Sequence, residues 1–106
     1  MALDKTSEMA RLKTKLTVDL LWIYILGLLK EKPMHAYIIR KEISERFGFL
    51  SGNVSAYVVL YKLQSRGFVS GKEEGNRTVY SITAKGKELF KEAEKEFEKL
   101  QKTIFK

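Results

Sequence analysis

A predicted helix from about Asn53 or Ser55 to Arg66 carries the side chains best suited to chemistry in this chain. The face opposite its apolar side holds a serine, two valines and two cations: Ser55, Val58, Val59, Lys62 and Arg66. A serine can meet a base edge or a phosphate, valines can touch thymine methyl groups, and cations can bind phosphates or guanine. An ordinary solvated face is the alternative, but such a face gains nothing from two adjacent valines. We therefore expect this face to contact DNA.

Polar residues near the starts of two predicted helices extend this surface. Ser51 and Asn53 can cap the helix that follows them and can also bind a phosphate, because helix N-termini attract anions. Tyr37 and Arg40, at the start of the preceding helix, are further candidate phosphate ligands. A place in the core is the alternative for Tyr37.

A basic-flanked hairpin is predicted directly after the helix, beginning at Phe68-Val69, turning through Glu74-Gly75-Asn76 and returning over residues 77–82. Lys72, Asn76 and Arg77 could reach the minor groove or its phosphates. Glu73 and Glu74 beside them would repel phosphate, so any contact must be selective, and a plain turn is the alternative. A short helix followed by a basic hairpin is the arrangement of a winged helix, whose helix enters the major groove.

Residue counts argue against catalysis and metal binding. The chain has one histidine, His35, two aspartates and no cysteine, so a catalytic triad or a thiolate metal site lacks partners. The segment from Gly67 to Lys72 resembles a phosphate loop only superficially, because it lacks the four-residue gap and leads into a strand. We interpret His35 as a turn or capping residue, and we predict no enzyme activity, no metal and no cofactor.

Composition favours an anionic partner inside the cell. The net charge is +7 and the sequence pI is about 9.6, which favours nucleic acid first and an acidic membrane surface second. The surplus is spread along the chain, which is weaker evidence than a basic stripe. The apolar run Leu20–Leu29 is too short to span a bilayer comfortably, and a central buried helix explains it better. With no cysteine present, we expect a cytoplasmic protein without a membrane-spanning segment.

Periodicity and breakers place the remaining elements. Residues 3–30 are mainly helical in pattern, with an amphipathic arm over residues 1–15 that could lie on a partner helix or be a frayed terminus. Pro33 ends this helix, and a second helix follows over residues 35–47 with Gly48 as its C-cap. The third helix has Tyr57, Leu60 and Leu63 on its apolar side and Gly67 as its cap. No short strand before the third helix is evident.

The last helix, from the N-cap Thr83 to about Phe105, carries a narrow apolar seam among lysines and glutamates. Such a helix is about 33 Å long, more than this small domain can cover. Packing on the chain's own first helix is one alternative, but we expect a second copy of the chain to cover the seam. The predicted dimer interface comprises Met9, Leu12, Leu16, Phe90, Ala93, Phe97, Leu100 and Ile104.

These elements predict a mainly α fold with a small β-hairpin (α+β). The architecture is a winged helix-turn-helix with an N-terminal helical extension and a long C-terminal dimerisation helix. The expected divisions are an arm over residues 1–15, a DNA-binding domain over 16–83 and a dimerisation helix over 84–106.

Over residues 18–90 the chain resembles the PadR family of winged-helix transcriptional regulators, in its smaller branch with a short last helix. Four stretches carry the resemblance: Asp19-Leu20-Leu21 with Ile25–Leu29; Pro33-Met34-His35-Ala36-Tyr37; Ser55, Tyr57, Leu60, Leu63 and Gly67-Phe68-Val69; and Tyr80, Ile82-Thr83, Gly86 and Leu89. Ala36 replaces the family's usual glycine. The resemblance implies a dimeric repressor. Some members bind aromatic acids or drugs, but the drug-binding tryptophan of the last helix has no counterpart here.

The sequence therefore predicts a homodimeric, sequence-specific regulator, a repressor of a roughly palindromic operator in double-stranded DNA. An architectural DNA-binding protein with little sequence preference is the alternative, because diffuse positive charge would permit it. A protein-interaction module is a third reading, which the basic surplus disfavours. A small-molecule effector is conceivable, but no residue pattern supports one.

Overall fold

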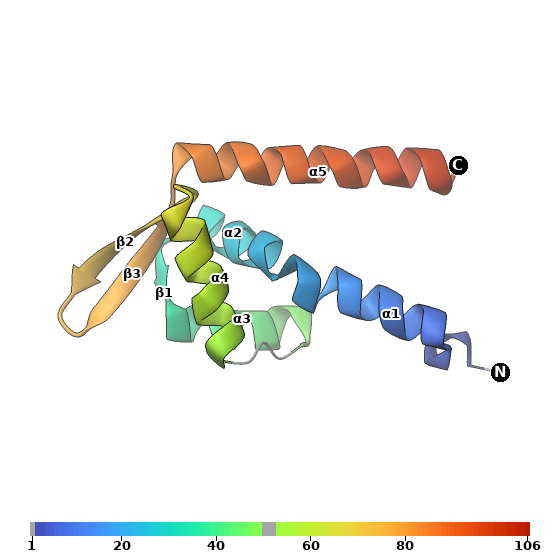
Figure 1. The fold of residues 1–106 in the computed structure, drawn as a ribbon, viewed down its shortest axis with the longest axis horizontal. Helices are drawn as coiled ribbons and strands as arrows, with labels where there is room; N and C mark the ends of the chain where they lie inside the picture. Colours follow the sequence, from blue (N-terminus) through green and yellow to red (C-terminus); the bar gives the residue numbers. More distant parts are fainter. Residues whose placement is uncertain (1, 50–52) are drawn as a thin grey trace.

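The computed structural model describes residues 2–49 and 53–106, and for residues 53–55 it describes the backbone only. Helices dominate, and one small sheet lies at one end of the molecule (Figure 1). In chain order the elements are the 3₁₀-helix η1 (Leu3–Lys5), α1 (Ser7–Leu16), the 3₁₀-helix η2 (Val18–Leu20), α2 (Leu21–Glu31), β1 (Met34–His35), α3 (Ala36–Phe47), α4 (Asn53–Ser65), β2 (Val69–Glu74), β3 (Arg77–Ile82) and α5 (Ala84–Ile104).

The N-terminal segment, predicted to be mainly helical over residues 3–30, is helical but broken at Thr17. Thr17 leaves the helical region with φ −113° and ψ −85°, and its hydroxyl donates to the carbonyl of Lys13 at 2.7 Å. Threonine side chains compete in this way for backbone carbonyls, and a β-branched Val18 follows. The hydroxyl of Tyr24 donates to the freed carbonyl of Leu16 at 2.6 Å. The break makes α1 a separate arm.

The core forms where α2, α3, α4 and the sheet meet. Helix α2 is apolar on almost every side and supplies the largest share of buried side chains, as expected for a central helix. Helix α4 contributes Ala56, Leu60 and Leu63, and the prediction that Tyr57 lies on its apolar side is wrong. Tyr57 is 52% exposed, because the position of α2 selects the face centred on Ala56 and Leu60.

The sheet has three antiparallel strands in the order β1-β3-β2, one more than the predicted hairpin. The hairpin lies where the sequence placed it, with Glu74 paired with Arg77 and a turn at Gly75, whose φ is +64°. Strand β1 adds only Met34 and His35, which pair with Tyr80 and Val79. Two residues carry no periodic signal, so the sequence could not reveal this strand.

An exposed arginine joins α2 to α3. Arg46 contacts Glu31 on α2 at 2.6 Å and Glu42 on its own helix at 2.6 Å. The hydrogen bond from Arg46 lowers the pKa of Glu31 from its ordinary value. A lowered carboxyl pKa stabilises the folded state when the pH is above the ordinary pKa of the carboxyl group. This small contribution disappears as the pH falls through the lowered pKa.

The start of α5 is fastened to the end of α4 and the start of β2. Thr83 caps α5 by accepting from the Gly86 amide at 3.0 Å, and its own hydroxyl donates to the Gly67 carbonyl at 2.6 Å. The Thr83 amide donates to the Phe68 carbonyl at 3.1 Å. Gly86 lies so close to this carbonyl that a Cβ there would overlap its oxygen. The absence of a side chain at position 86 therefore allows the close approach.

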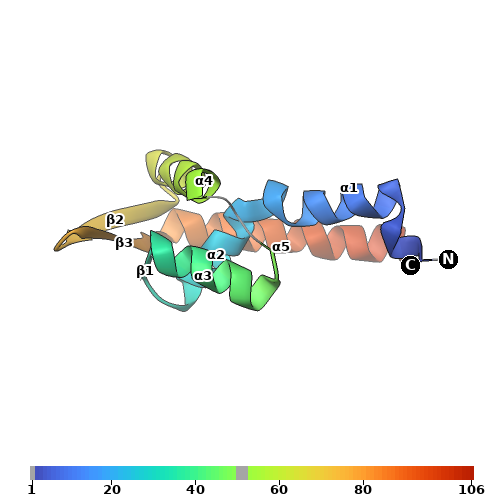
Figure 2. The same ribbon diagram turned by 90° about the horizontal axis from the view of Figure 1, so that it is seen from below.

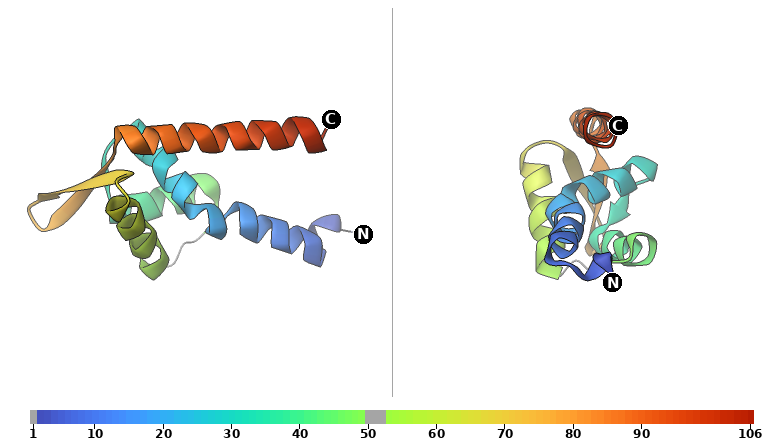
Figure 3. Two further views of the ribbon diagram at one scale, coloured as in Figure 1. Left: turned by 45° about the horizontal axis from the view of Figure 1, so that its top comes forward. Right: turned by 90° about the vertical axis from the view of Figure 1, so that its right-hand side faces the viewer.

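Beyond this junction the molecule is elongated, with principal extents of 53 × 26 × 20 Å. Helices α1 and α5 project from the core at the end opposite the hairpin (Figure 1), and the same arrangement is seen from below in Figure 2. The oblique and end-on views in Figure 3 show α5 and α1 as separate arms. The N-terminal half of α5 packs on α2, whereas its C-terminal half is exposed.

We predict that Gly86→Ala destabilises the protein by about 2–4 kcal/mol, because the added methyl group must push α5 away from the Phe68 carbonyl. Helix propensity alone would instead stabilise the Gly86→Ala variant by about 1 kcal/mol. Urea unfolding followed by circular dichroism measures the change.

Gly27→Ala is the matched control, since its Cβ would meet only the movable ring of Phe90 at 3.3 Å. We expect the control to change the free energy of unfolding by less than about 1 kcal/mol. A Gly86→Ala variant as stable as the parent would contradict the proposed packing.

Candidate nucleic-acid interface

Helix α4 presents an exposed, largely aromatic face. Among its described side chains, Tyr57, Val58 and Tyr61 expose 52%, 43% and 71% of their surfaces, and Lys62 and Ser65 are exposed beside them. The helix contains no acidic residue in its sequence. A face without negative charge can approach a phosphate backbone without repulsion.

The predicted contact face of this helix is only partly reproduced. Val58 and Lys62 are exposed as expected, whereas Val59 is half-buried against the core, and its groove contact stays a prediction. Val59 and Val58 are neighbours in sequence and therefore about 100° apart around the helix. Arg66 follows the last turn of α4 and is exposed.

Val59, Lys62 and Arg66 line a cavity of about 410 Å³. It lies between α2, α4 and the start of α5, with Lys62 and Arg66 among an otherwise apolar lining. The residues that line it are Trp22, Val59, Lys62, Leu63, Arg66, Phe68 and Leu89. Lys62 and Arg66 thus border this cavity as well as the solvent.

Three predicted contacts stay predictions. Ser51 lies outside the described residues, and Asn53 and Ser55 lie in the first turn of α4 with side chains outside the description.

The wing formed by β2 and β3 carries its predicted polar residues at and near the tip. Lys72, Asn76 and Arg77 are all exposed. Glu73 and Glu74 are exposed as well, so two adjacent carboxylates lie between Lys72 and Arg77 in the hairpin. The wing therefore offers separate positive positions rather than a uniform positive edge.

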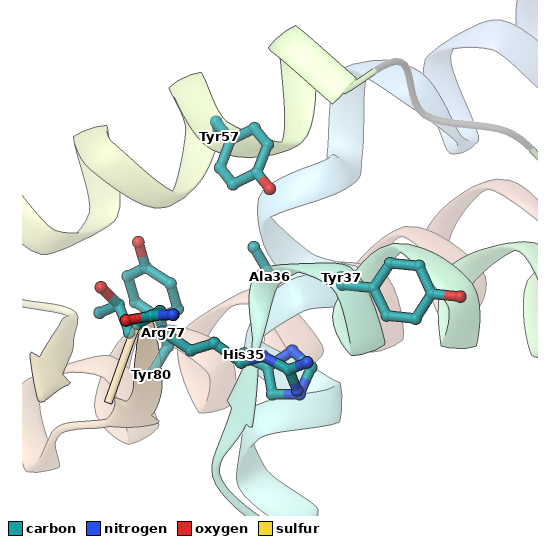
Figure 4. A pocket seen from close by; sticks show the side chains of 8 residues that line it. His35, Ala36, Tyr37, Tyr57, Arg77 and Tyr80 are labelled. Atoms are coloured by element: carbon teal, nitrogen blue, oxygen red, sulfur yellow. The ribbon is translucent and has the colours of Figure 1, made fainter. Parts of the chain in front are cut away.

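A second cavity, of about 480 Å³, lies where the wing, α4 and the start of α3 converge (Figure 4). Its lining combines a cation, a histidine, an amide and three tyrosines: His35, Ala36, Tyr37, Tyr57, Asn76, Arg77, Thr78 and Tyr80. We call it the wing cleft. Hydroxyl, amide and guanidinium donors around one open cavity suit an anion such as a phosphodiester.

His35, predicted to be a turn or capping residue, occupies the N-cap position of α3 and contacts the arginine of the wing cleft. Its side chain makes no cap hydrogen bond on α3, although its backbone occupies the N-cap position. Instead Nε2 of His35 lies 3.3 Å from Nη1 of Arg77, so the imidazole accepts a hydrogen bond when this nitrogen carries no proton. Pairing of His35 with Val79 explains the contact, because Val79 and Arg77 share one face of β3.

Tyr37 and Arg40 lie on one side of α3. Tyr37 is 62% exposed and stacks against His35 with ring centroids 6.4 Å apart, which rules out the alternative of a core residue. Arg40 is half-buried, and its Nε atom is buried without a hydrogen-bond partner among the described residues. Neither placement tests contact with DNA.

The predicted interface residues on the two arms differ in exposure. Phe97, Leu100 and Ile104 expose 42%, 47% and 63%, while Ala93 is half-buried. On α1, Leu12 and Leu16 are exposed and Met9 is half-buried. Phe90 packs on its own chain, since its ring lies against Gly27 and 5.6 Å from Nζ of Lys30. The seam is thus shared between intrachain packing and an open apolar surface.

Other site types find no support among the described residues. Over residues 2–49 and 53–106, no group of three histidine, cysteine or acidic side chains could hold a metal ion. In the same ranges, no helix combines the length and apolar character needed to cross a membrane.

Sequence reasoning singled out neither the exposed Tyr61 nor the contact of His35 with Arg77. Tyr61 lies four residues after Tyr57, and this spacing would have placed both on one helix face. No sequence signal links His35 to Arg77, because their contact depends on the pairing of β1 with β3.

Comparisons with known proteins agree with this geometry. The profile of the transcriptional regulator PadR-like family matches residues 25–92. A proposed transcriptional regulator from Thermoplasma acidophilum is 31% identical, with a TM-score of 0.73 over 85% of this chain and 90% of the other. A transcriptional regulator from Clostridium thermocellum is 27% identical, with a TM-score of 0.72 over 78% and 87%. No curated protein matches the chain.

Bacillus subtilis PadR, solved in complex with operator DNA, is 26% identical with a TM-score of 0.62. The match covers 69% of this chain and 45% of that longer one. The fold and the family are those that the sequence predicted, and the family's regulators are not enzymes. Since the family profile covers more than half of the chain, this protein belongs to the PadR-like family of DNA-binding transcriptional regulators.

Proposed function

We propose that the protein is a homodimeric repressor that binds a roughly palindromic operator. The observation that carries the proposal is the convergence of the exposed face of α4, the wing and the start of α3 around the wing cleft. Residues 16–83 would bind DNA, residues 84–106 would dimerise, and residues 1–15 would form an accessory arm. The complex of Bacillus subtilis PadR with operator DNA supports the assignment of the partner.

Helix α4 would lie in the major groove, which is wide enough for an α-helix. Its exposed side chains, Tyr57, Val58, Tyr61 and Lys62, would then face base edges and the adjacent backbone. Base contacts supply the preference for one sequence, whereas contacts to phosphates fix the register.

The wing cleft would hold a backbone phosphate beside the groove. Arg77 is the cation of the cleft, and the hydrogen bond to His35 restricts the positions that its guanidinium samples. The hydroxyl of Tyr57 points toward the space between α4 and α3 (Figure 4), from where it could donate to the same phosphate. A pre-positioned guanidinium loses less side-chain entropy when it binds.

The exposed seam of α5 supports a dimer. Phe97, Leu100 and Ile104 lie on one side of the free half of this helix, as in a helix that packs against another helix. A two-fold dimer presents two copies of α4 to DNA, which requires half-sites about 34 Å apart, or one turn. The exposed Leu12 and Leu16 on α1 could add to this interface. Bound across a promoter, such a dimer would block RNA polymerase sterically.

We predict that the protein binds its operator at least about a thousandfold more tightly than random DNA at physiological salt. The operator would be sought in the region upstream of the protein's own gene, and affinities would be measured by fluorescence anisotropy on duplexes of equal length. A ratio below about tenfold would replace the repressor with the architectural alternative.

Arg77→Ala should weaken binding to operator and random DNA by similar factors, because an interaction with a phosphate carries no sequence information. The slope of log affinity against log salt should fall by about 0.9 for each phosphate that the variant no longer neutralises. Lys102→Ala, at the far end of α5, removes the same charge and should leave the slope unchanged. A larger decrease in affinity for the operator than for random DNA would assign Arg77 to base recognition instead.

Phe97→Glu should convert the dimer to a monomer at micromolar concentration, because it places an unpaired carboxylate in the apolar seam. Multi-angle light scattering measures the mass. Lys102→Glu adds negative charge on the opposite side of α5 and should remain dimeric. If Phe97→Glu also remains dimeric, a surface other than the α5 seam holds the two copies together.

A further inference from the structure

Tyr61 is the most exposed of the large apolar side chains described, at 71%. It lies on α4 four residues after Tyr57 and three after Val58, so these side chains form one continuous apolar face. A tyrosine ring so exposed contributes little to folding, since burial of apolar area is what stabilises. The ring is therefore available for an intermolecular contact.

Between residues 56 and 65, the exposed face of α4 has one side chain that could read a base by paired hydrogen bonds, Lys62, which also borders the cavity beside α2. Across residues 56–65 its polar members are Lys62 and Ser65, and the Ser65 hydroxyl already donates to the Lys62 carbonyl at 3.0 Å. Gln64 points elsewhere, since its Nε2 atom lies 3.2 Å from the place a Cβ on Gly71 would occupy. Neither an arginine for guanine nor an amide for adenine is thus present on this part of the face.

The two tyrosines occupy different surroundings. Tyr57 lines the wing cleft and is directed toward α3 (Figure 4), which places it beside the proposed phosphate. Tyr61 is not among the residues that line either described cavity. Of the two rings, that of Tyr61 is thus free to meet the floor of the groove.

We propose that Tyr61, assisted by Val58, determines sequence preference by packing its ring against thymine methyl groups in the major groove. The thymine methyl is the apolar group that distinguishes base pairs at the major-groove edge, so it is the feature that this face can recognise. The inference rests on the proposed function, in which α4 enters the major groove. It predicts an operator with thymines at the positions that face the second turn of α4.

Replacement of thymine by uracil tests this contact, because it removes the methyl group and keeps the base pair. The probe is a duplex enriched from a randomised pool by the intact protein, synthesised with thymine or with uracil. We expect uracil to weaken binding about fourfold for each methyl group contacted. Tyr61→Ala should weaken binding to the thymine duplex about tenfold, and it should bind the two duplexes within about twofold of each other.

Two variants separate the ring from other effects. Tyr61→Phe keeps the ring and should keep the preference for thymine over uracil. Tyr37→Ala removes a tyrosine that is 62% exposed on α3, and it should weaken binding to both duplexes equally. Circular dichroism confirms that each variant is folded.

The possible outcomes separate a failure of the inference on Tyr61 from a failure of the proposed function. If the intact protein selects a sequence but binds the thymine and uracil duplexes equally, the inference on Tyr61 fails and the repressor proposal stands. Disappearance of the preference in Tyr61→Phe would also overturn it, because the hydroxyl would then be the reading group. If the pool yields no preferred sequence, both proposals fail.

Discussion

The close approach of α5 to the Phe68 carbonyl is the contact on which the arrangement of this protein depends. Gly86 permits it, and Thr83 reinforces it through hydrogen bonds to Gly67, Phe68 and Gly86. Gly67 and Phe68 lie between the end of α4 and the start of β2, while Thr83 and Gly86 lie at the start of α5. The direction of the C-terminal arm is thereby fixed relative to α4 and the wing. In a dimer held by that arm, the junction would determine the separation of the two copies of α4.

Strand β1 has an effect out of proportion to its length. Pairing of Met34 and His35 with β3 holds the start of α3 against the wing. That pairing brings His35 to Arg77 and forms one side of the wing cleft, whose lining comes from β1, α3, α4 and the wing. A buried backbone hydrogen-bond ladder defines positions better than surface side chains can. The geometry of the candidate phosphate site thus depends on a strand of two residues.

In the candidate DNA-binding surface, charged side chains lie mainly on the wing and apolar side chains lie mainly on α4. The net charge of +7 is distributed over the chain, and the wing has two glutamates between its cations Lys72 and Arg77. Such a distribution supports attraction to DNA in general but little discrimination between sequences. The exposed face of α4 has the opposite character, with tyrosines and a valine and no acidic residue. In the proposed function, affinity would come mainly from the wing and preference mainly from α4.

Local signals in the sequence were sufficient for several helix ends and for the hairpin, but not for strand β1 or for the break at Thr17. Pro33, Gly48, Gly67 and Thr83 each fixed an end of a helix, because each acts through its own backbone or side chain. The turn at Gly75 fixed the register of the hairpin for the same reason.

The tertiary structure decided which face of each element is used. It placed Ala56 rather than Tyr57 in the core, buried Val59 in part, separated α1 from α2 at Thr17, and directed His35 to Arg77. Adjacent apolar residues on a helix such as α4 allow more than one inward face, and only the position of α2 selects among them. Contacts between residues far apart in the chain, such as His35 and Arg77, leave no local pattern, because the pairing of distant strands creates them.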